Sequence, residues 1–243
     1  MKNIKKNILL RSRYKIIFCC NILGFTLLVW HALAWPGGGL FWLDSAVFRF
    51  FNTRIVAGSA FADILAIVNN RLFDVVILAI MGLFYLYYFI KTDNAGKRRL
   101  IALGVIMVCS GVFLKLLGHH SPIQHASPTL FFEDAYRLGE HVAIKTKDSA
   151  WESFPSDHAM MFMIFAAFME RYLGRKAFLA AACLGVLFCL PRIAIGSHWV
   201  TDVCIGSLSV VSIFCSWLLL TPVSDKIASK IERYIPTTLF PIK

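Results

Sequence analysis

Six apolar runs dominate the chain, and each is long enough, or nearly so, to cross a lipid bilayer. They cover about residues 16–35, 73–90, 100–117, 159–173, 177–190 and 203–221. A spanning helix needs about 20 apolar residues because each residue advances it by about 1.5 Å. The fourth and fifth runs are shorter, so we expect their helices to continue into the flanking polar residues. The pattern predicts an all-α, polytopic membrane protein with six transmembrane helices.

The composition supports the membrane class and one domain over residues 1–243, since 58% of the residues are hydrophobic and only 16% are charged. The net charge of +11 does not predict nucleic-acid binding, because the basic residues lie between apolar runs and not on one soluble face. The basic start before the first run also fits a signal peptide. The run is long and lacks a small-residue cleavage site, so an uncleaved first span is favoured.

Charge asymmetry predicts the orientation of these spans. The side with both termini and the loops near residues 91–99 and 170–176 has 17 Lys and Arg against four acids, and the other side has eight against ten. By the positive-inside rule, both termini are cytoplasmic, and a bacterial inner membrane would place the opposite loops in the periplasm. The seven cysteines fall in or at the edges of the runs and predict buried thiols, not disulfides.

Two segments outside the spans also predict structure. Residues 41–56 mix aromatic and charged side chains, with apolar residues near helical spacing, which predicts an interfacial amphipathic helix. Residues 118–157 form the longest polar stretch, which predicts a lid or a substrate-gripping loop, although a plain solvated connector is the alternative.

The most informative stretch runs from Pro191 to Asp202, where three ionisable side chains interrupt an apolar sequence. If the segment from Ser197 onward is helical, His198 and Asp202 stand at i and i+4 on one face. The carboxylate then accepts the proton of one ring nitrogen and leaves the other nitrogen as a nucleophile. Arg192 precedes that helix and offers a fork for an oxyanion.

A second stretch, Phe154 to His158, ends the long polar loop and opens an apolar run. Pro155 and Ser156 are typical of a helix start, whose N–H groups and dipole favour an anion. Two histidines in different roles, an arginine and a helix N-terminus together predict phosphoryl transfer through a phosphohistidine, with no metal and no other cofactor. The alternative is that these polar side chains only anchor the helices at the membrane surface.

This pattern of Arg, five residues, His, three residues and Asp, preceded by Pro-Ser-x-His, resembles the type 2 phosphatidate phosphatase superfamily of membrane lipid phosphatases. The resemblance implies that His198 is the nucleophile, that Asp202 orients it and that His158 protonates the leaving group. It also implies that Arg192 and Ser156 contact the phosphate.

The resemblance narrows to the lipid A 1-diphosphate synthase branch of that superfamily and covers about residues 40–226. The motifs that carry it are Asn69-Asn70-Arg71 with Phe73-Asp74, Ala126 to Leu130, Thr146-Lys147-Asp148, and Leu220-Thr221-Pro222 with Ser224-Asp225. It implies lipid substrates, with undecaprenyl diphosphate as the donor and the 1-phosphate of lipid A as the acceptor.

Two positions depart from the superfamily pattern. Asp157 replaces the glycine of Pro-Ser-Gly-His, as the lipid A branch also allows. We expect it in the phosphate-binding site, where it offers a carboxylate beside His158. The first motif keeps Lys115 as an expected phosphate contact, but Pro122 and Ile123 occupy its Arg-Pro positions. The nearest basic candidates for that corner are His119, His120 and His125.

The sequence leaves the phosphoryl acceptor open. Water would make the enzyme a plain phosphatase of undecaprenyl diphosphate or another lipid phosphate, whereas a lipid phosphate would make it a transferase. A transporter or structural membrane protein is a rival of another class. That rival predicts charges at mid-span, whereas these cluster at span ends on one side.

Overall fold

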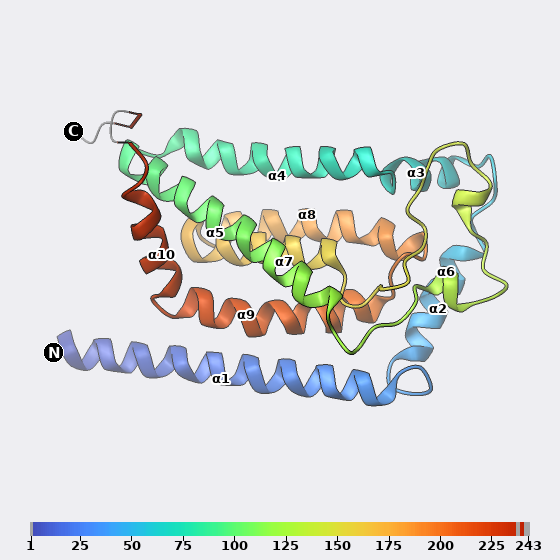
Figure 1. Cartoon of the computed structure of the whole chain (residues 1–243), viewed down its shortest axis with the longest axis horizontal. Coiled ribbons are helices and arrows are strands. Elements are labelled where there is room, and N and C mark those ends of the chain that lie inside the picture. Colours follow the sequence, from blue (N-terminus) through green and yellow to red (C-terminus); the bar gives the residue numbers. More distant parts are fainter. Residues whose placement is uncertain (1, 237–238, 241–243) are drawn as a thin grey trace.

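The computed structural model is a bundle of long helices that lie side by side, with short helices and loops at one end (Figure 1). It describes residues 2–236 and 239–240, with side chains from Ser12 onward. In chain order the helices are α1 (Lys2–Ala34), α2 (Phe41–Asn52), α3 (Ala60–Val68), α4 (Arg71–Lys91), α5 (Asn94–His119), α6 (Pro128–Phe131), η1 (Leu138–Glu140), α7 (Asp157–Leu173), α8 (Arg175–Ala194), η2 (Asp202–Ser207), α9 (Leu208–Leu220) and α10 (Val223–Glu232). The all-α prediction is confirmed.

Five segments of the described chain are long and apolar enough to cross a membrane, which confirms the polytopic membrane class. They are Ser12–Ala34, Arg71–Lys91, Asn94–His119, Arg175–Ala194 and Asp202–Leu220. The predicted span at residues 159–173, which is not among these five, corresponds to α7. Its 17 residues cover about 26 Å, a little less than the roughly 30 Å of a hydrocarbon core. α7 lies among α5, α8 and α9, so the bundle interior and not lipid surrounds most of it.

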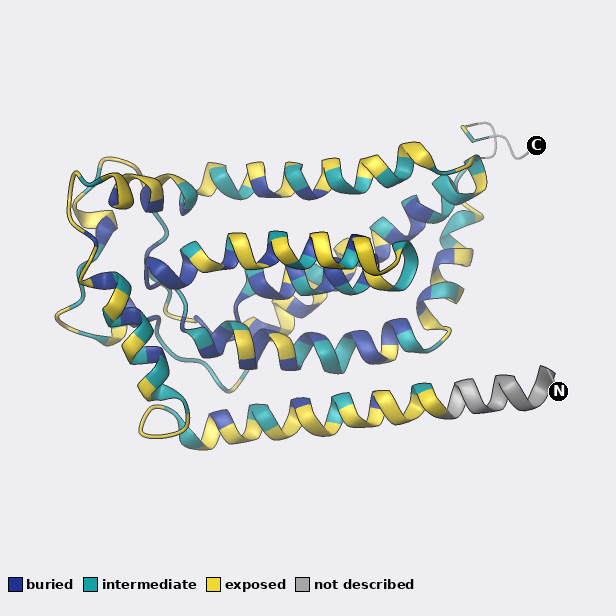
Figure 2. Cartoon of the chain, turned by 180° about the vertical axis from the view of Figure 1, so that it is seen from behind, coloured by how far each residue is buried: buried dark blue, intermediate teal, exposed yellow. Residues whose placement is uncertain are grey.

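Small residues allow the two most extensively packed helices, α7 and α8, to approach closely. Ala177 and Ala181 are fully buried on α8, and a Cβ on Gly185 would stand 3.1 Å from the Cβ of Phe162 on α7. Small interfacial residues are typical of helix pairs in membranes, where lipid removes the hydrophobic drive for association. The outer faces instead expose large apolar residues, above all along α1 (Figure 2), as expected of a lipid-facing surface.

The predicted interfacial helix is α2, but it ends at Asn52 and not near Val56. Its buried residues are Asp44, Phe48 and Asn52, spaced four residues apart. Two of these are polar because α2 packs against the loops and the turn after α8, and not only against apolar surface. α2 is therefore part of the wall that supports the loop end of the bundle.

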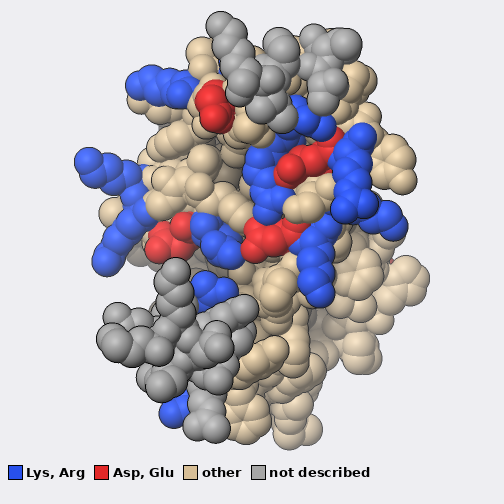
Figure 3. All heavy atoms as spheres, turned by 90° about the vertical axis from the view of Figure 1, so that its left-hand side faces the viewer, with Lys and Arg blue, Asp and Glu red and all other residues tan. Residues whose placement is uncertain are grey.

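The end that holds both termini is the basic one, and Figure 3 views the molecule from that end. Arg99 of α5 pairs with Asp225 and Glu232 of α10, at 2.6 and 2.8 Å. Arg171 at the end of α7 pairs with the same Asp225 at 3.1 Å. These pairs fix α10 across the bundle, while further Lys and Arg side chains extend outward around them (Figure 3).

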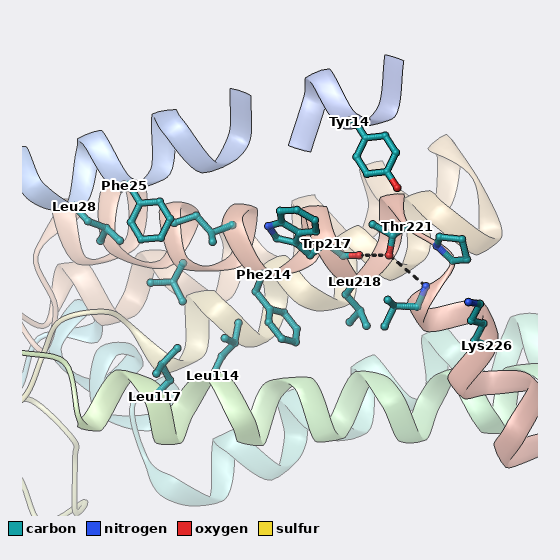
Figure 4. Close-up of a pocket in the computed structure, with 14 residues that line it drawn as sticks. Tyr14, Phe25, Leu28, Leu114, Leu117, Phe214, Trp217, Leu218, Thr221 and Lys226 are labelled. Atoms are coloured by element: carbon teal, nitrogen blue, oxygen red, sulfur yellow. Dashed lines mark hydrogen bonds between the residues drawn. The ribbon is translucent and has the colours of Figure 1, made fainter. Parts of the chain in front are cut away.

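An apolar groove of about 670 Å³ lies between α1, α5 and α9 (Figure 4). Phe25 and Leu28 line it from α1, Leu114 and Leu117 from α5, and Trp217 from α9. Its few polar groups, such as Thr221 and Lys226, lie near the basic end of the bundle. The groove offers no group for phosphoryl chemistry.

Candidate active site

The fold brings the two sequence motifs together at the loop end of the bundle, away from both termini (Figure 1). The Ser156 N–H donates to the Asp202 carbonyl at 3.4 Å. The Ser207 hydroxyl lies against the carbonyl oxygens of both residues, at 3.0 Å from Ser156 and 2.9 Å from Asp202. Because Ser207 lies five residues beyond Asp202, this contact accompanies the π-helical turn of η2, a feature often found at functional sites. The start of α7 and the start of η2 are therefore fixed to each other.

His198 and Asp202 are in contact, but not as the i, i+4 pair on one helix that the sequence predicted. The helix begins at Val200, so His198 lies in the turn before it and Asp202 in its first turn. The Trp199 N–H donates to Asp202 Oδ2 at 2.9 Å, which is the reach-back contact of a capping box. His198 Nδ1 lies 3.3 Å from the same oxygen. A helix cap thus supplies the juxtaposition that a continuous helix was expected to give.

The surroundings of His198 fix which ring nitrogen carries the proton. Nδ1 lies 3.0 Å from the Ser153 carbonyl oxygen and 3.3 Å from the Asp202 carboxylate. Both partners accept hydrogen bonds, so Nδ1 must donate, and in the neutral ring Nε2 keeps its lone pair. Nε2 has no hydrogen-bond partner among the described residues. This is the protonation state that a nucleophilic histidine needs.

A tight turn carries His198 away from α8. Gly196 has a φ of +86°, and a Cβ there would lie 2.6 Å from a ring carbon of Phe48 and 2.8 Å from Thr129 Cγ2. Only glycine meets both demands without strain. The Ser197 and His198 N–H groups then fold back onto the Arg192 carbonyl, at 3.1 and 3.3 Å. The turn therefore fixes the position of His198 relative to Arg192.

Asp44 of α2 supports the same turn from outside. Its carboxylate accepts the Thr201 N–H at 3.0 Å and the Thr201 hydroxyl at 2.5 Å. The side chain is 1% exposed, and burial raises its pKa to about 6. Asp44 thus satisfies a free N–H at the start of the helix that carries Asp202.

A cluster of four charged or titratable groups lies beside this turn. Asp74 of α4 accepts from Arg192 Nη2 at 2.6 Å and from Lys147 Nζ at 2.7 Å. His158 Nε2 lies 3.2 Å from Asp74 and 3.1 Å from Arg192 Nη2. Arg192 is 3% exposed, so the carboxylate compensates a buried guanidinium. The structure therefore joins Arg192 and His158, and it adds Asp74 and Lys147, which the sequence motifs did not assign.

His158 Nε2 can satisfy only one of its two contacts at a time. A neutral Nε2 accepts from Arg192, whereas a protonated Nε2 donates to Asp74. Asp74, and not the adjacent Asp157, is the carboxylate that His158 contacts. The pocket thus offers a partner to His158 in both protonation states, as a group that gives and takes a proton requires.

Ser156 is the residue before α7, but its hydroxyl does not cap the helix. The residue is 1% exposed, and its Oγ has no hydrogen-bond partner among the described residues. A buried hydroxyl without a partner costs stability. This cost is recovered if a ligand oxygen forms a hydrogen bond with the Ser156 hydroxyl.

The remaining sequence candidates lie further out or behind the site. Lys115 Nζ pairs with Asp157 at 3.3 Å and remains half exposed. His119 and His120 bond to Glu152 and to the Leu116 carbonyl, respectively, so neither joins the Arg192 cluster. His125 lies in the long loop with Nε2 at 3.6 Å from Asp202 Oδ1, and burial lowers its pKa. His125 therefore lies behind the Asp202 carboxylate and not in the Arg192 cluster.

A cavity of about 340 Å³ opens from the cluster between α4, α5 and α7. Asp74, Lys115, Lys147, Asp157 and His158 line its polar end. Its other wall is apolar and consists of Val75, Ile77, Leu78, Met81, Met161 and Phe162. The described residues include no group of three or more His, Cys, Asp or Glu side chains arranged to hold a metal ion. A cavity with a polar end and an apolar wall suits an amphiphile with an anionic head group.

Two comparisons relate the chain to known proteins. Residues 128–227 match the PAP2 superfamily, and this segment contains both histidine motifs. Over 224 residues, 90% of this chain and 93% of the relative, the sequence is 41% identical to lipid A 1-diphosphate synthase of Escherichia coli (strain K12). No solved structure matches the chain. The chain therefore belongs to the PAP2 superfamily of lipid phosphatases and phosphotransferases, in the family of lipid A 1-diphosphate synthase.

Proposed function

We propose that this membrane enzyme transfers the terminal phosphoryl group of a polyprenyl diphosphate to the 1-phosphate of lipid A, through a phosphohistidine on His198. The carrying observation is that Nδ1 of His198 faces two acceptors and leaves Nε2 unprotonated. The name of the relative supports the lipid A acceptor. The whole chain acts as one membrane-embedded domain.

In the first half-reaction the Nε2 lone pair forms a bond to the terminal phosphorus. The bond from phosphorus to the bridging oxygen breaks, and its electron pair leaves on the polyprenyl phosphate, which takes a proton from His158. In the second half, an acceptor phosphate oxygen gives its proton to His158 and bonds to phosphorus, while the N–P electron pair returns to Nε2. Arg192 and Ser156 stabilise the oxygens of the transferred group. Asp202 fixes the tautomer of His198.

A labelled donor tests the acceptor. The purified protein is incubated with undecaprenyl diphosphate that carries ³²P in its terminal phosphate, with and without lipid A. Transfer moves the label onto lipid A, whereas hydrolysis releases it as free phosphate. Release of all label as free phosphate in the presence of lipid A would exclude the transferase.

Replacing His158 by alanine should damage hydrolysis of a phosphomonoester lipid much more than use of a diphosphate donor. A diphosphate donor expels a phosphate, a good leaving group, whereas a monoester expels an alkoxide that needs the acid. We expect a loss of about 10²- to 10⁴-fold with the monoester and a clearly smaller loss with the diphosphate. Initial rates at saturating substrate measure both. Equal losses with unchanged binding would make His158 a phosphate-positioning group.

We also propose that the loop end faces the periplasm of a bacterial inner membrane, with both termini in the cytoplasm. The excess of Lys and Arg at the opposite end supports this orientation (Figure 3). In a variant freed of native cysteines, Lys145→Cys should react with an impermeant thiol reagent in intact cells, whereas Lys97→Cys should react only after lysis. The reverse pattern would put the site on the cytoplasmic side.

A further inference from the structure

We propose that Lys147 forms a second phosphate corner, which binds the lipid-borne phosphate that is never transferred. This phosphate belongs first to the leaving polyprenyl phosphate and then to the accepting lipid phosphate. The proposal rests on the function proposed above. It gives a binding group to the lipid-borne phosphate of the diphosphate, for which the histidine motifs supply none.

A phosphohistidine is formed and discharged from the same side of the phosphorus atom. In-line displacement places the leaving oxygen opposite the attacking Nε2, and the acceptor oxygen must later attack from that same side. Both oxygens belong to a phosphate carried on a lipid. A single cationic corner on that side can therefore bind the leaving phosphate in one half-reaction and the accepting phosphate in the other.

Lys147 lies next to the cation that we assign to the transferred phosphate. Its Nζ lies 2.7 Å from Asp74 Oδ2, while Oδ1 of the same carboxylate accepts from Arg192 and faces His158. Asp74 thus pairs with two cations: Arg192, which we assign to the transferred phosphate, and Lys147 beside it. Without substrate, Asp74 supplies the negative charge between these cations.

The backbone around Lys147 is fixed to the turn between α3 and α4. The Lys147 N–H donates to the Asn69 carbonyl at 3.0 Å, and the Asn70 side chain donates to the Lys145 carbonyl at 2.7 Å. Asn70 and Thr146 also form an isolated antiparallel bridge. These contacts join two motifs that are about 75 residues apart in sequence. They hold a loop lysine beside α4 at the position of Asp74.

The cavity beside Lys147 fits a lipid phosphate better than free phosphate. Lys147 and Lys115 line its polar end, each beside a carboxylate, and side chains of α4 and α7 continue it as an apolar wall. The lysine is 37% exposed, so its ammonium can reach a ligand without leaving Asp74. A phosphomonoester on a hydrocarbon chain satisfies both ends of the cavity, whereas inorganic phosphate satisfies one.

The test separates the two phosphate sites by inhibition. Undecaprenyl phosphate carries only the lipid-borne phosphate, whereas vanadate imitates the transferred phosphoryl group on His198. In Lys147→Ala, the inhibition constant for undecaprenyl phosphate and the KM for lipid A should rise roughly 10- to 100-fold, because a charge-assisted contact is lost. The vanadate inhibition constant should change less than about threefold.

Two matched variants make the result specific. Lys147→Arg retains a cation and should recover most of the affinity for undecaprenyl phosphate, and exposed Lys145→Ala, two residues away, should behave as wild type. Thermal unfolding in detergent checks that Lys147→Ala is folded. Equal weakening of vanadate and lipid phosphate, or no weakening of either, overturns the corner. A wild type that hydrolyses the donor but never labels lipid A overturns the proposed acceptor, and the inhibition contrast still tests Lys147.

Discussion

Replacing His198 by alanine is expected to abolish both transfer to lipid A and hydrolysis of the donor. Without Nε2 no covalent intermediate forms, and the remaining groups only bind and polarise the phosphate. Loss of a nucleophile that acts together with its partners costs about 10⁶-fold in turnover in well-studied hydrolases. We expect a loss of this order in initial rates with undecaprenyl diphosphate.

The measurement needs a structural control and a direct view of the intermediate. His120→Ala removes an exposed histidine whose ring, among the described residues, bonds the Leu116 carbonyl alone, and it should retain normal turnover. In a rapid quench, wild type should carry acid-labile ³²P from the donor, and His198→Ala should carry none. Normal turnover by a folded His198→Ala protein would contradict the nucleophile assignment.

The spans were predictable from the sequence because a membrane imposes a length and a hydropathy that any chain must meet. The exact ends of the spanning helices were harder to predict. α8 extends to Ala194 and takes Arg192 into its last turn, since Asp74 compensates the buried charge there. A local pattern does not reveal a partner 118 residues away.

The same limit applies to the site: contacts within one motif can be predicted from the sequence, whereas contacts between distant segments cannot. The contact between His198 and Asp202 could be predicted from their spacing, because both residues belong to one motif. His158 contacts Asp74 and Arg192, which lie outside its motif, so its partners could not be predicted in this way.

In the sequence, Lys147 and Asp74 belong only to motifs that have no assigned role. The two residues meet only where the long loop packs on α4. The loop was expected to be a lid, a gripping element or a plain connector, and the phosphate corner that we propose at Lys147 is the part of it that would grip a substrate.

The Asp44 contact could not be predicted from α2 alone. An acid on an amphipathic helix normally faces water, yet this one is buried against Thr201. Its partner is a backbone N–H that becomes free only because the helix starts at Val200 and not at Ser197. The later helix start therefore accounts for the buried acid, because it frees the N–H that Asp44 binds.

Replacing Asp202 by asparagine tests the second large effect and should leave the fold intact while it removes most activity. The amide oxygen of asparagine can still accept the Trp199 N–H, so the helix cap survives. Trp199 and His198 contact the same oxygen of Asp202, so this amide oxygen also accepts from His198 Nδ1 and keeps the tautomer. The variant lacks the negative charge that stabilises the ring once phosphorylation makes it positively charged, so we expect the loss of activity to come from the missing charge.

The same change in a serine protease triad lowers turnover by about 10⁴-fold through the wrong tautomer. Here the amide oxygen and the Ser153 carbonyl both keep Nδ1 as the donor, so we expect a smaller loss, about 10²- to 10³-fold, from the missing charge. Initial rates with the diphosphate donor measure it, and unchanged thermal unfolding shows that the cap is retained. Asp134→Asn, which changes an exposed carboxylate paired with Arg49, is the control. A loss below about tenfold would mean that the charge of Asp202 contributes little and that Asp202 acts mainly as a helix cap.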